Sequence, residues 1–183
     1  MDVCVAHKDG VTLAVAEDVF LALWAAPATV QRIDWVTAFL ASRIELGDGS
    51  LRACQFLLPT ASPPGIREVP AILRGVRCIV PRTRVLVTVA LGDLRFADLV
   101  VSVLTLGTRL TGVARQVVVC RSFADAFECM EAAPTDGVPR TMDTRAANGW
   151  GRLERAQMEN LSERLFLEGR AENWLKPAPA HLA

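Results

Sequence analysis

The side chains that could perform chemistry are scattered along this chain of 183 residues. Its five cysteines stand singly, and its two histidines, His7 and His181, lie near the ends of the sequence. A nucleophilic serine or cysteine needs a base beside it, and a zinc site needs several clustered ligands. The sequence also carries neither of the glycine-rich motifs that hold nucleotides. We therefore predict no catalytic residue, no metal site and no cofactor.

Cys78 belongs to a short motif with the spacing of a phosphatase active-site loop. Residues 78–84 read Cys-x5-Arg, the spacing of phosphatase loops, in which backbone N–H groups hold an anion beside a thiolate. Those loops lead from a strand into a helix, whereas this segment leads from an expected helix into an expected strand, and Pro81 removes an N–H donor. We therefore interpret Cys78 as a buried residue that closes a helix, and Arg82 and Arg84 as solvated.

The amino-acid composition indicates a globular protein and argues against binding to nucleic acid or to a membrane. Hydrophobic residues make up 51% of the chain, which is enough for a sizeable core, and 20 basic residues balance 20 acidic ones. A neutral chain has no net field that would attract nucleic acid or an anionic membrane. The first residues lack the features of a secretory signal, and no apolar run approaches the ~20 residues of a membrane span. We expect a cytoplasmic protein with reduced thiols.

The middle of the chain organises the expected fold. Residues 85–91 are apolar at nearly every position, which is typical of a strand buried on both faces. Residues 94–110 have the apolar spacing of a helix, and 117–120 form a second apolar run. Ser122 then heads a capping box for a helix over 123–131. This order of strand, helix, strand and helix predicts a crossover unit and a mostly parallel sheet.

The N-terminal part adds a hairpin and further alternation of helix and strand. The apolar runs 11–16 and 19–25 predict an edge hairpin that leads into an inner strand. A helix that begins at Pro27 or Thr29 and ends near residue 46 is expected next. A buried strand over 54–58 follows it.

The start of the following helix depends on prolines. Ser62, which precedes Pro63, is one candidate N-cap, because proline is tolerated in a first helical turn. Pro70 would either kink that helix or delay its start to about Glu68. Residues 1–133 are therefore predicted to form an α/β domain, a mixed and mostly parallel sheet with alternating helices in the order βαβαβαβα.

The rest of the chain is interpreted as a linker over 134–149, an amphipathic helical tail over 150–176 and a terminus over 177–183. Tryptophan is enriched at the centres of protein interfaces, and an amphipathic helix can dock in a groove of a partner. We predict that this tail binds another chain, with a second copy of the protein included, and self-packing is the alternative. The residues predicted to bind are Trp150, Leu153, Leu161, Leu165, Phe166, Trp174 and Leu175.

The order of elements and one local pattern suggest a family. Residues 17–24, Glu-Asp-Val-Phe-Leu-Ala-Leu-Trp, followed by a helix near Pro27, resemble the opening of the STAS domain, the fold of bacterial anti-sigma factor antagonists. The later strand, helix, strand and short helix resemble it too, and the resemblance covers about residues 8–133. It implies a STAS-like fold and a regulatory role in protein contacts.

The STAS resemblance also implies a phosphorylation site. In that family a serine or threonine after the third strand accepts the phosphate, within an Asp-Ser-Ser/Thr-Gly motif. In this chain residues 59–65 read Pro-Thr-Ala-Ser-Pro-Pro-Gly, so the aspartate of the motif is missing. The resemblance implies Thr60 and Ser62 as possible phospho-acceptors. The alternative is an ordinary loop in which Ser62 is a helix cap.

The sequence leaves two functions open. The first is a non-enzymatic, cytoplasmic interaction module, either a regulatory module or a subunit of an assembly, whose partner is a protein or a second copy, without nucleic acid or a membrane span. The second is a small-ligand-binding α/β protein or enzyme with its site at the carboxyl ends of the strands, where open sheets usually place it. Its candidate site residues are Thr60, Ser62, Asp93, Arg95, Arg121 and Ser122.

Overall fold

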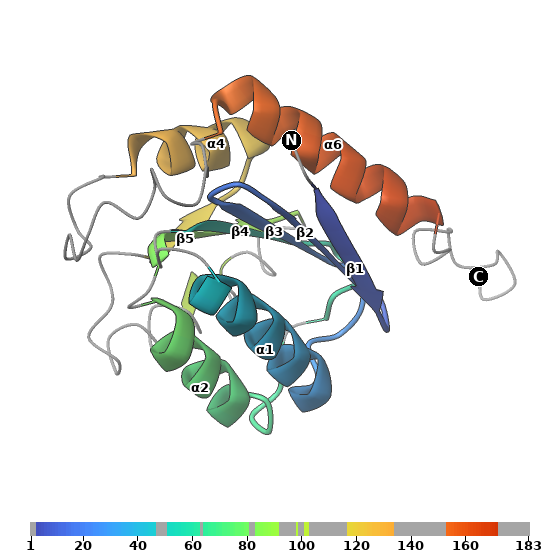
Figure 1. Ribbon diagram of the computed structural model, residues 1–183. Coiled ribbons are helices and arrows are strands. Elements are labelled where there is room, and N and C mark those ends of the chain that lie inside the picture. The colour runs from blue at the N-terminus through green and yellow to red at the C-terminus, as the bar shows by residue number, and fades with distance from the viewer. Residues whose placement is uncertain are drawn as a thin grey trace, which may run out of the picture.

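The computed structural model describes residues 3–46, 51–62, 64–80, 83–91, 98, 101–102, 117–133 and 153–171. Within this part of the chain, a six-stranded sheet has α1 and α2 on one face and α4 and α6 on the other (Figure 1). The strands are β1 (Cys4–Lys8), β2 (Val11–Ala16), β3 (Val19–Trp24), β4 (Leu51–Leu57), β5 (Thr83–Ala90) and β6 (Val117–Cys120). The helices are α1 (Val30–Leu46), α2 (Val69–Ile79), α4 (Phe123–Ala132) and α6 (Arg155–Ala171).

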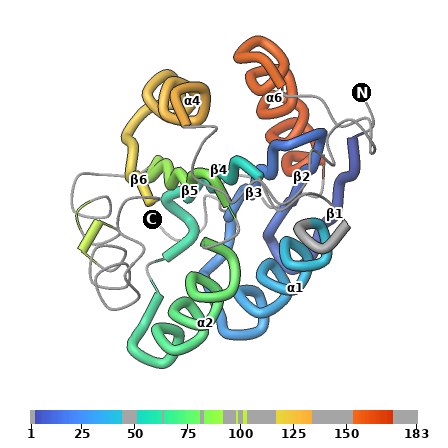
Figure 2. Tube along the Cα trace, turned by 60° about the vertical axis from the view of Figure 1, so that its left-hand side comes forward, coloured from blue at the N-terminus to red at the C-terminus, as the bar shows by residue number. Residues whose placement is uncertain are grey.

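The strands lie side by side in the order of the sequence, from β1 to β6 (Figure 2). The first three strands pair antiparallel, and β3 to β6 pair parallel. The predicted α/β class with a mixed, mostly parallel sheet is therefore confirmed, and so is a C-terminal helix. In the described part of the chain, every helix lacks the length and apolar character that a membrane span requires.

The edge of the sheet differs from the prediction. The predicted hairpin is β2 and β3, but β1 lies outside it and pairs antiparallel with β2. Strand β1 was not predicted because it is short and ends in the polar His7 and Lys8. The turn into β2 requires a glycine at position 10, where φ is +82°. A Cβ there would also lie 2.5 Å from the Cβ of Ala26.

Proline fixes the start of α2. The helix begins at Val69, with Glu68 as its N-cap and Pro70 in the first turn. Pro70 has no N–H and clashes with a preceding turn, so it is tolerated only where the helix starts. The delayed start near Glu68 is thus confirmed, and the prediction that Ser62 caps this helix is wrong.

The other predicted helix cap is confirmed. Ser122 precedes α4 and its hydroxyl accepts a hydrogen bond from the backbone N–H of Asp125 at 3.1 Å. The apolar face of α4 then packs toward β5 and β6. The helix predicted over 94–110 lies mostly outside the described residues, as does the proposed linker.

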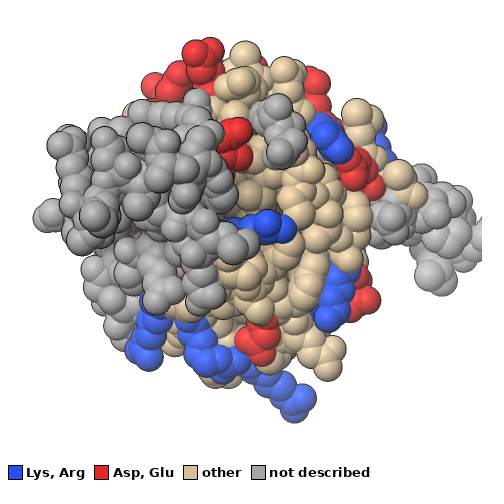
Figure 3. Space-filling view, viewed as in Figure 1, with Lys and Arg blue, Asp and Glu red and all other residues tan. Residues whose placement is uncertain are grey.

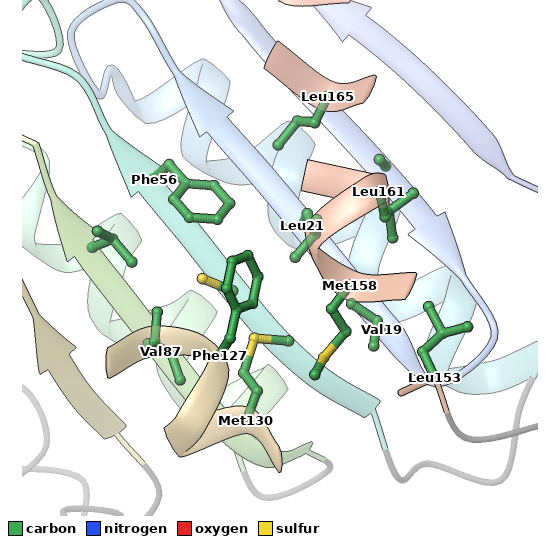
Figure 4. Packing of buried hydrophobic residues seen from close by; sticks show 14 of the residues in the cluster. Val19, Leu21, Phe56, Val87, Phe127, Met130, Leu153, Met158, Leu161 and Leu165 are labelled. Carbon is green, nitrogen blue, oxygen red and sulfur yellow. The ribbon is translucent and has the colours of Figure 1, made fainter. Parts of the chain in front are cut away.

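The C-terminal helix completes the core on this side of the sheet. Helix α6 packs across β2 and β3, beside α4. Figure 4 shows side chains of α6 and its N-terminal approach meeting side chains of α4 and of the strands. The buried residues labelled there are Val19, Leu21, Phe56, Val87, Phe127, Met130, Leu153, Met158, Leu161 and Leu165.

Candidate functional site

A cavity of about 150 Å³ lies between the sheet and helices α1 and α2. It lies where β3 and β4 end, because Trp24 and Leu57, the last residues of these strands, both line it. The sheet, the two helices and the loop after β4 contribute its apolar wall. This wall includes Phe20, Ala22, Trp24, Ile33, Ala61 and Ile72.

A buried polar group of a wall residue has no partner among the described residues. The side chain of Trp24 is almost fully buried, and its indole N–H has no hydrogen-bond acceptor within the described part of the chain. Leaving such a donor unpaired in the interior costs about 1–3 kcal/mol. By contrast, the side-chain amide of Gln55 donates to the hydroxyl of Thr88 at 2.7 Å. The indole N–H is therefore a buried donor of a wall residue that is left without an acceptor in the described part of the chain.

The described residues of the wall are mostly apolar. Acidic side chains, lysine, arginine and histidine do not occur among the described residues that line the cavity. Cys54 is the one cysteine among them, but its side chain packs in the core on the opposite face of the sheet, where burial, with the nearby Cys120 and Cys129, raises its pKa well above the ordinary value. A protonated, buried thiol is a poor nucleophile. The arrangement can bind an apolar molecule, and the polar groups of the wall include the hydroxyls of Thr37 and Ser62 as well as the Trp24 indole.

The loop predicted to carry chemistry borders this cavity. Ser62 lines it, and Thr60 is exposed two residues before. The candidates at the β6–α4 connection lie elsewhere. Arg121 forms an exposed ion pair with Asp98 at 3.1 Å, and Ser122 caps α4. Asp93 and Arg95 lie outside the described residues, and of the four candidates that the structure describes, Ser62 is the one that lines the cavity.

The predicted partner-binding residues divide into three groups. Leu153, Leu161 and Leu165 are buried in the core of their own chain, which corresponds to the self-packing alternative. Phe166 is half-buried and lines a groove between α4 and α6. Trp150, Trp174 and Leu175 lie outside the described residues.

A buried ionic network, which was not predicted from the sequence, holds the start of α6. The guanidinium of Arg52 is fully buried and donates two hydrogen bonds to the carboxylate of Asp18, at 2.7 and 2.9 Å. Arg52 also donates to the carbonyl of Leu153 at 2.8 Å, and the N–H of Leu153 donates to Asp18 at 3.1 Å. The sequence signal that could have indicated this network is the presence of two charged residues, Asp18 and Arg52, in or beside strands that are otherwise apolar.

The structure corrects the interpretation of the Cys-x5-Arg segment. Cys78 was expected to be buried, but it is exposed. Arg84 was expected to be solvated, but it is 8% exposed and lies 3.5 Å from the carboxylate of Asp18. The reason is that Arg84 belongs to the central strand β5, where a side chain on either face is covered by helices. Arg82 lies outside the described residues.

A second concave surface, the α4–α6 groove, lies on the opposite face of the sheet. It encloses about 430 Å³, and its apolar part is Phe123, Phe127 and Phe166. The rings of Phe123 and Phe166 meet edge to face at 5.5 Å between centroids, and Phe123 stacks on the buried Phe56 at 5.1 Å. Charged side chains border the groove, namely Arg155, Glu159, Glu163 and Arg170.

Within the described residues, no group of three His, Cys, Asp or Glu side chains is placed to hold a metal ion. Comparisons of the chain with protein-family models, with curated proteins and with solved structures find no match. The function must therefore be inferred from the geometry of the cavity and of the groove. The resemblance to the STAS domain stays a prediction.

Proposed function

We propose that this protein is a non-enzymatic binding protein whose cavity takes a small, mostly apolar molecule with one hydrogen-bond acceptor. The observation that carries this proposal is the buried indole N–H of Trp24 in the wall of an apolar cavity. Ligand sites are typically apolar pockets with a few placed polar groups, and this cavity has that character. A cytoplasmic location, expected from the sequence, belongs to the same proposal.

The volume limits the size of the ligand. Apolar cavities of roughly 150 Å³ stay dry and bind molecules such as benzene, whereas drug-sized ligands need about 300 Å³ or more. The cavity of this protein has about 150 Å³. We therefore propose a molecule of roughly six to nine non-hydrogen atoms, such as a substituted single ring or a short branched chain.

The polarity of the wall limits the chemistry of the ligand. An oxygen acceptor such as a ketone would accept a hydrogen bond from the Trp24 indole, which relieves the cost of the unpaired donor. An ionised ligand does not fit, because a charge moved into an apolar site needs an opposite charge. No charged side chain occurs among the described residues of the wall.

Calorimetry with two probes of equal size tests the proposal. Acetophenone carries a carbonyl acceptor, and α-methylstyrene has nearly the same shape with a CH₂ group in place of the oxygen. We expect both to bind the full chain, with acetophenone tighter by about two- to tenfold, the value of one net hydrogen bond. Trp24→Phe should remove that preference, because phenylalanine keeps a six-membered aromatic ring and lacks the N–H.

A pocket-filling variant supplies the matched control for this experiment. Ala22→Leu places a larger side chain in the cavity and should abolish binding of both probes. Ala132→Leu adds the same atoms at an exposed position of α4 and should bind both probes as the unaltered chain does. Equal binding by Ala22→Leu, or no binding of either probe by the unaltered chain, contradicts the proposal.

The α4–α6 groove favours a second function, a protein-interaction module. Its aromatic floor includes Phe166, and its rim carries charges of both signs. An amphipathic helix of a partner would place its apolar stripe on the rings and its charged side chains on the rim. Figure 3 shows acidic side chains near α4 at the top and basic side chains near α2 at the bottom of this view. A regulatory role of the STAS type would use such contacts.

Light scattering over a range of protein concentrations tests whether the partner is a second copy. Self-association through the α4–α6 groove should weaken in Phe166→Ala and persist in Leu167→Ala, because Leu167 is exposed beside the groove and does not line it. A dimer that survives Phe166→Ala contradicts this use of the groove.

Phosphorylation of Thr60 or Ser62 belongs to the same proposal of a regulatory interaction module. Both side chains are exposed.

A further inference from the structure

Two cysteine sulfurs lie in contact at the edge of the sheet. Cys120 is the last residue of β6, and Cys129 lies in α4, which begins after a connection of Arg121 and Ser122. The thiol of Cys120 donates to the sulfur of Cys129 across 3.9 Å. Both are free thiols in the structure. The contact is set by the short connection, which folds α4 directly back on the strand.

The two thiols have different surroundings. Cys120 is 6% exposed, whereas Cys129 is partly exposed. Burial, then the charge of Cys129 and the hydrogen bond to it, raise the pKa of Cys120 to about 12. Cys120 therefore keeps its proton and donates it, and Cys129 is the more exposed residue of the two. Cys129 lies beside the buried stripe of α4, which consists of Ala126, Phe127 and Met130.

We propose that Cys120 and Cys129 form a reversible disulfide when the protein meets a hydroperoxide, with Cys129 as the thiol that reacts first. The two sulfurs must approach from 3.9 Å to about 2.05 Å. Rotation of the partly exposed Cys129 side chain and a small shift of α4 supply this movement. The disulfide would form in the protein without a bound ligand, and its formation does not depend on the cavity on the other face of the sheet.

The reaction balances with one equivalent of hydroperoxide. The Cys129 thiolate attacks a peroxide oxygen, so an S–O bond forms, the O–O bond breaks, and an alcohol or water leaves with a proton. Cys120 then loses its proton and attacks the sulfur of the Cys129 sulfenic acid, which forms the S–S bond and releases water. Two electrons pass from the pair of sulfurs to the peroxide. A dithiol reductant restores both thiols.

The bond would fix one wall of the α4–α6 groove. Phe123 and Phe127 of α4 line that groove, and the disulfide would tie α4 to the strand beneath it. The oxidised protein is thus expected to hold these two rings more rigidly. This consequence does not depend on which partner the groove takes.

Peptide mapping on the full chain tests the proposal. The protein is treated with one equivalent of hydrogen peroxide, its remaining thiols are alkylated, and it is digested with trypsin. Cleavage after Arg115, Arg121 and Arg140 places Cys120 in peptide 116–121 and Cys129 in peptide 122–140. We expect these two peptides joined and the loss of two hydrogen atoms, with three of the five cysteines alkylated (five minus two).

Three variants assign the roles. Cys129→Ser should prevent the bond, and Cys120→Ser should leave a Cys129 sulfenic acid that dimedone traps. Cys78→Ser, which removes an exposed cysteine elsewhere, should form the bond as the unaltered chain does. Separate, alkylated peptides after peroxide treatment, or a bond between other cysteines, overturn the proposal. The mapping of the unaltered chain decides the question even where a variant fails to fold.

Discussion

Two alanines in neighbouring strands, Ala14 of β2 and Ala22 of β3, lie on opposite faces of the sheet and meet different surroundings. Ala14 is packed in the core with the residues of α6, where apolar side chains fill the space. Ala22 borders a cavity of about 150 Å³ beneath α1 and α2. Interiors are normally close-packed, so an unfilled space on one face and a filled one on the other suggest different roles. One face holds the fold together, and the other has room for a ligand.

The largest expected effect comes from the ionic network of the filled face. Asp18→Ala removes the carboxylate between Arg52 and Arg84 and leaves both guanidinium groups buried without it. Breaking a buried pair from one side costs about 3–5 kcal/mol. We expect the free energy of unfolding in urea to fall by that amount, because the start of α6 also loses its anchor at Leu153.

An exposed ion pair is the control for this variant. Asp34→Ala breaks a pair with Arg74 at 3.1 Å, in which both side chains are more than half exposed. Such pairs contribute about 0–1 kcal/mol, so the two variants should differ clearly. A loss below about 1 kcal/mol for Asp18→Ala would show that the network does not hold α6.

The next largest effect comes from overfilling the packed face. Ala14→Leu forces three further carbon atoms into a site that is 1% exposed and surrounded by core side chains. Overpacking of this kind costs about 1–3 kcal/mol, and we expect that loss in the free energy of unfolding. An unchanged or higher stability would mean that this face also contains usable space.

The same substitution on the other face should have the opposite sign. Ala22 is equally buried, but its side chain borders the cavity. Filling a cavity commonly stabilises a protein by about 0.5–2 kcal/mol. We expect Ala22→Leu to unfold at higher urea concentration than the unaltered chain. A loss similar to that of Ala14→Leu would remove the contrast between the faces.

A smaller effect is expected from the buried thiols at alkaline pH. Burial raises the pKa of Cys54, and it raises that of Cys120 to about 12. In the unfolded chain a thiol loses its proton near pH 8.5. The folded state therefore binds more protons above that pH, and stability must fall as the pH rises from about 8.5 toward 12.

The expected loss is roughly 0.7 kcal/mol for each such thiol between pH 8 and 9, measured by urea unfolding at both pH values. Cys120→Ala should reduce the pH dependence. Cys78→Ala, which removes an exposed cysteine elsewhere in the chain, is the control variant. A pH dependence that Cys120→Ala does not alter would show that the buried thiol of Cys120 is not its cause.

Much of the fold could be predicted because its elements have strong local signals. The strand 117–120 agrees with β6, and 11–16 agrees with β2, since continuous apolar runs indicate buried strands. The cap at Ser122 and the start of α2 near Glu68 follow from hydroxyl and proline chemistry. The ion pairs Arg155–Glu159 and Arg164–Glu168 join residues four positions apart on α6, a spacing that favours such pairs on any helix.

The parts that depend on distant contacts could not be predicted. The pairing of Asp18 with Arg52 joins residues far apart in the sequence, and no local rule connects them. Strand β1 is stabilised by its neighbour rather than by its own composition. The cavity exists because side chains of the sheet and of helices α1 and α2 do not fill the space between them, and the sequence does not show how these elements pack. Of the residues that line the cavity, the sequence analysis had singled out Ser62 as a candidate site residue.

Pressurising a crystal of the protein with xenon tests the difference between the two faces most directly. Xenon binds in dry apolar cavities of this size. We predict a xenon atom between the sheet and helices α1 and α2, beside Ala22 and Trp24, and its loss in Ala22→Leu. No xenon at that place, or xenon within the core beneath α6, would contradict the proposed difference between the faces.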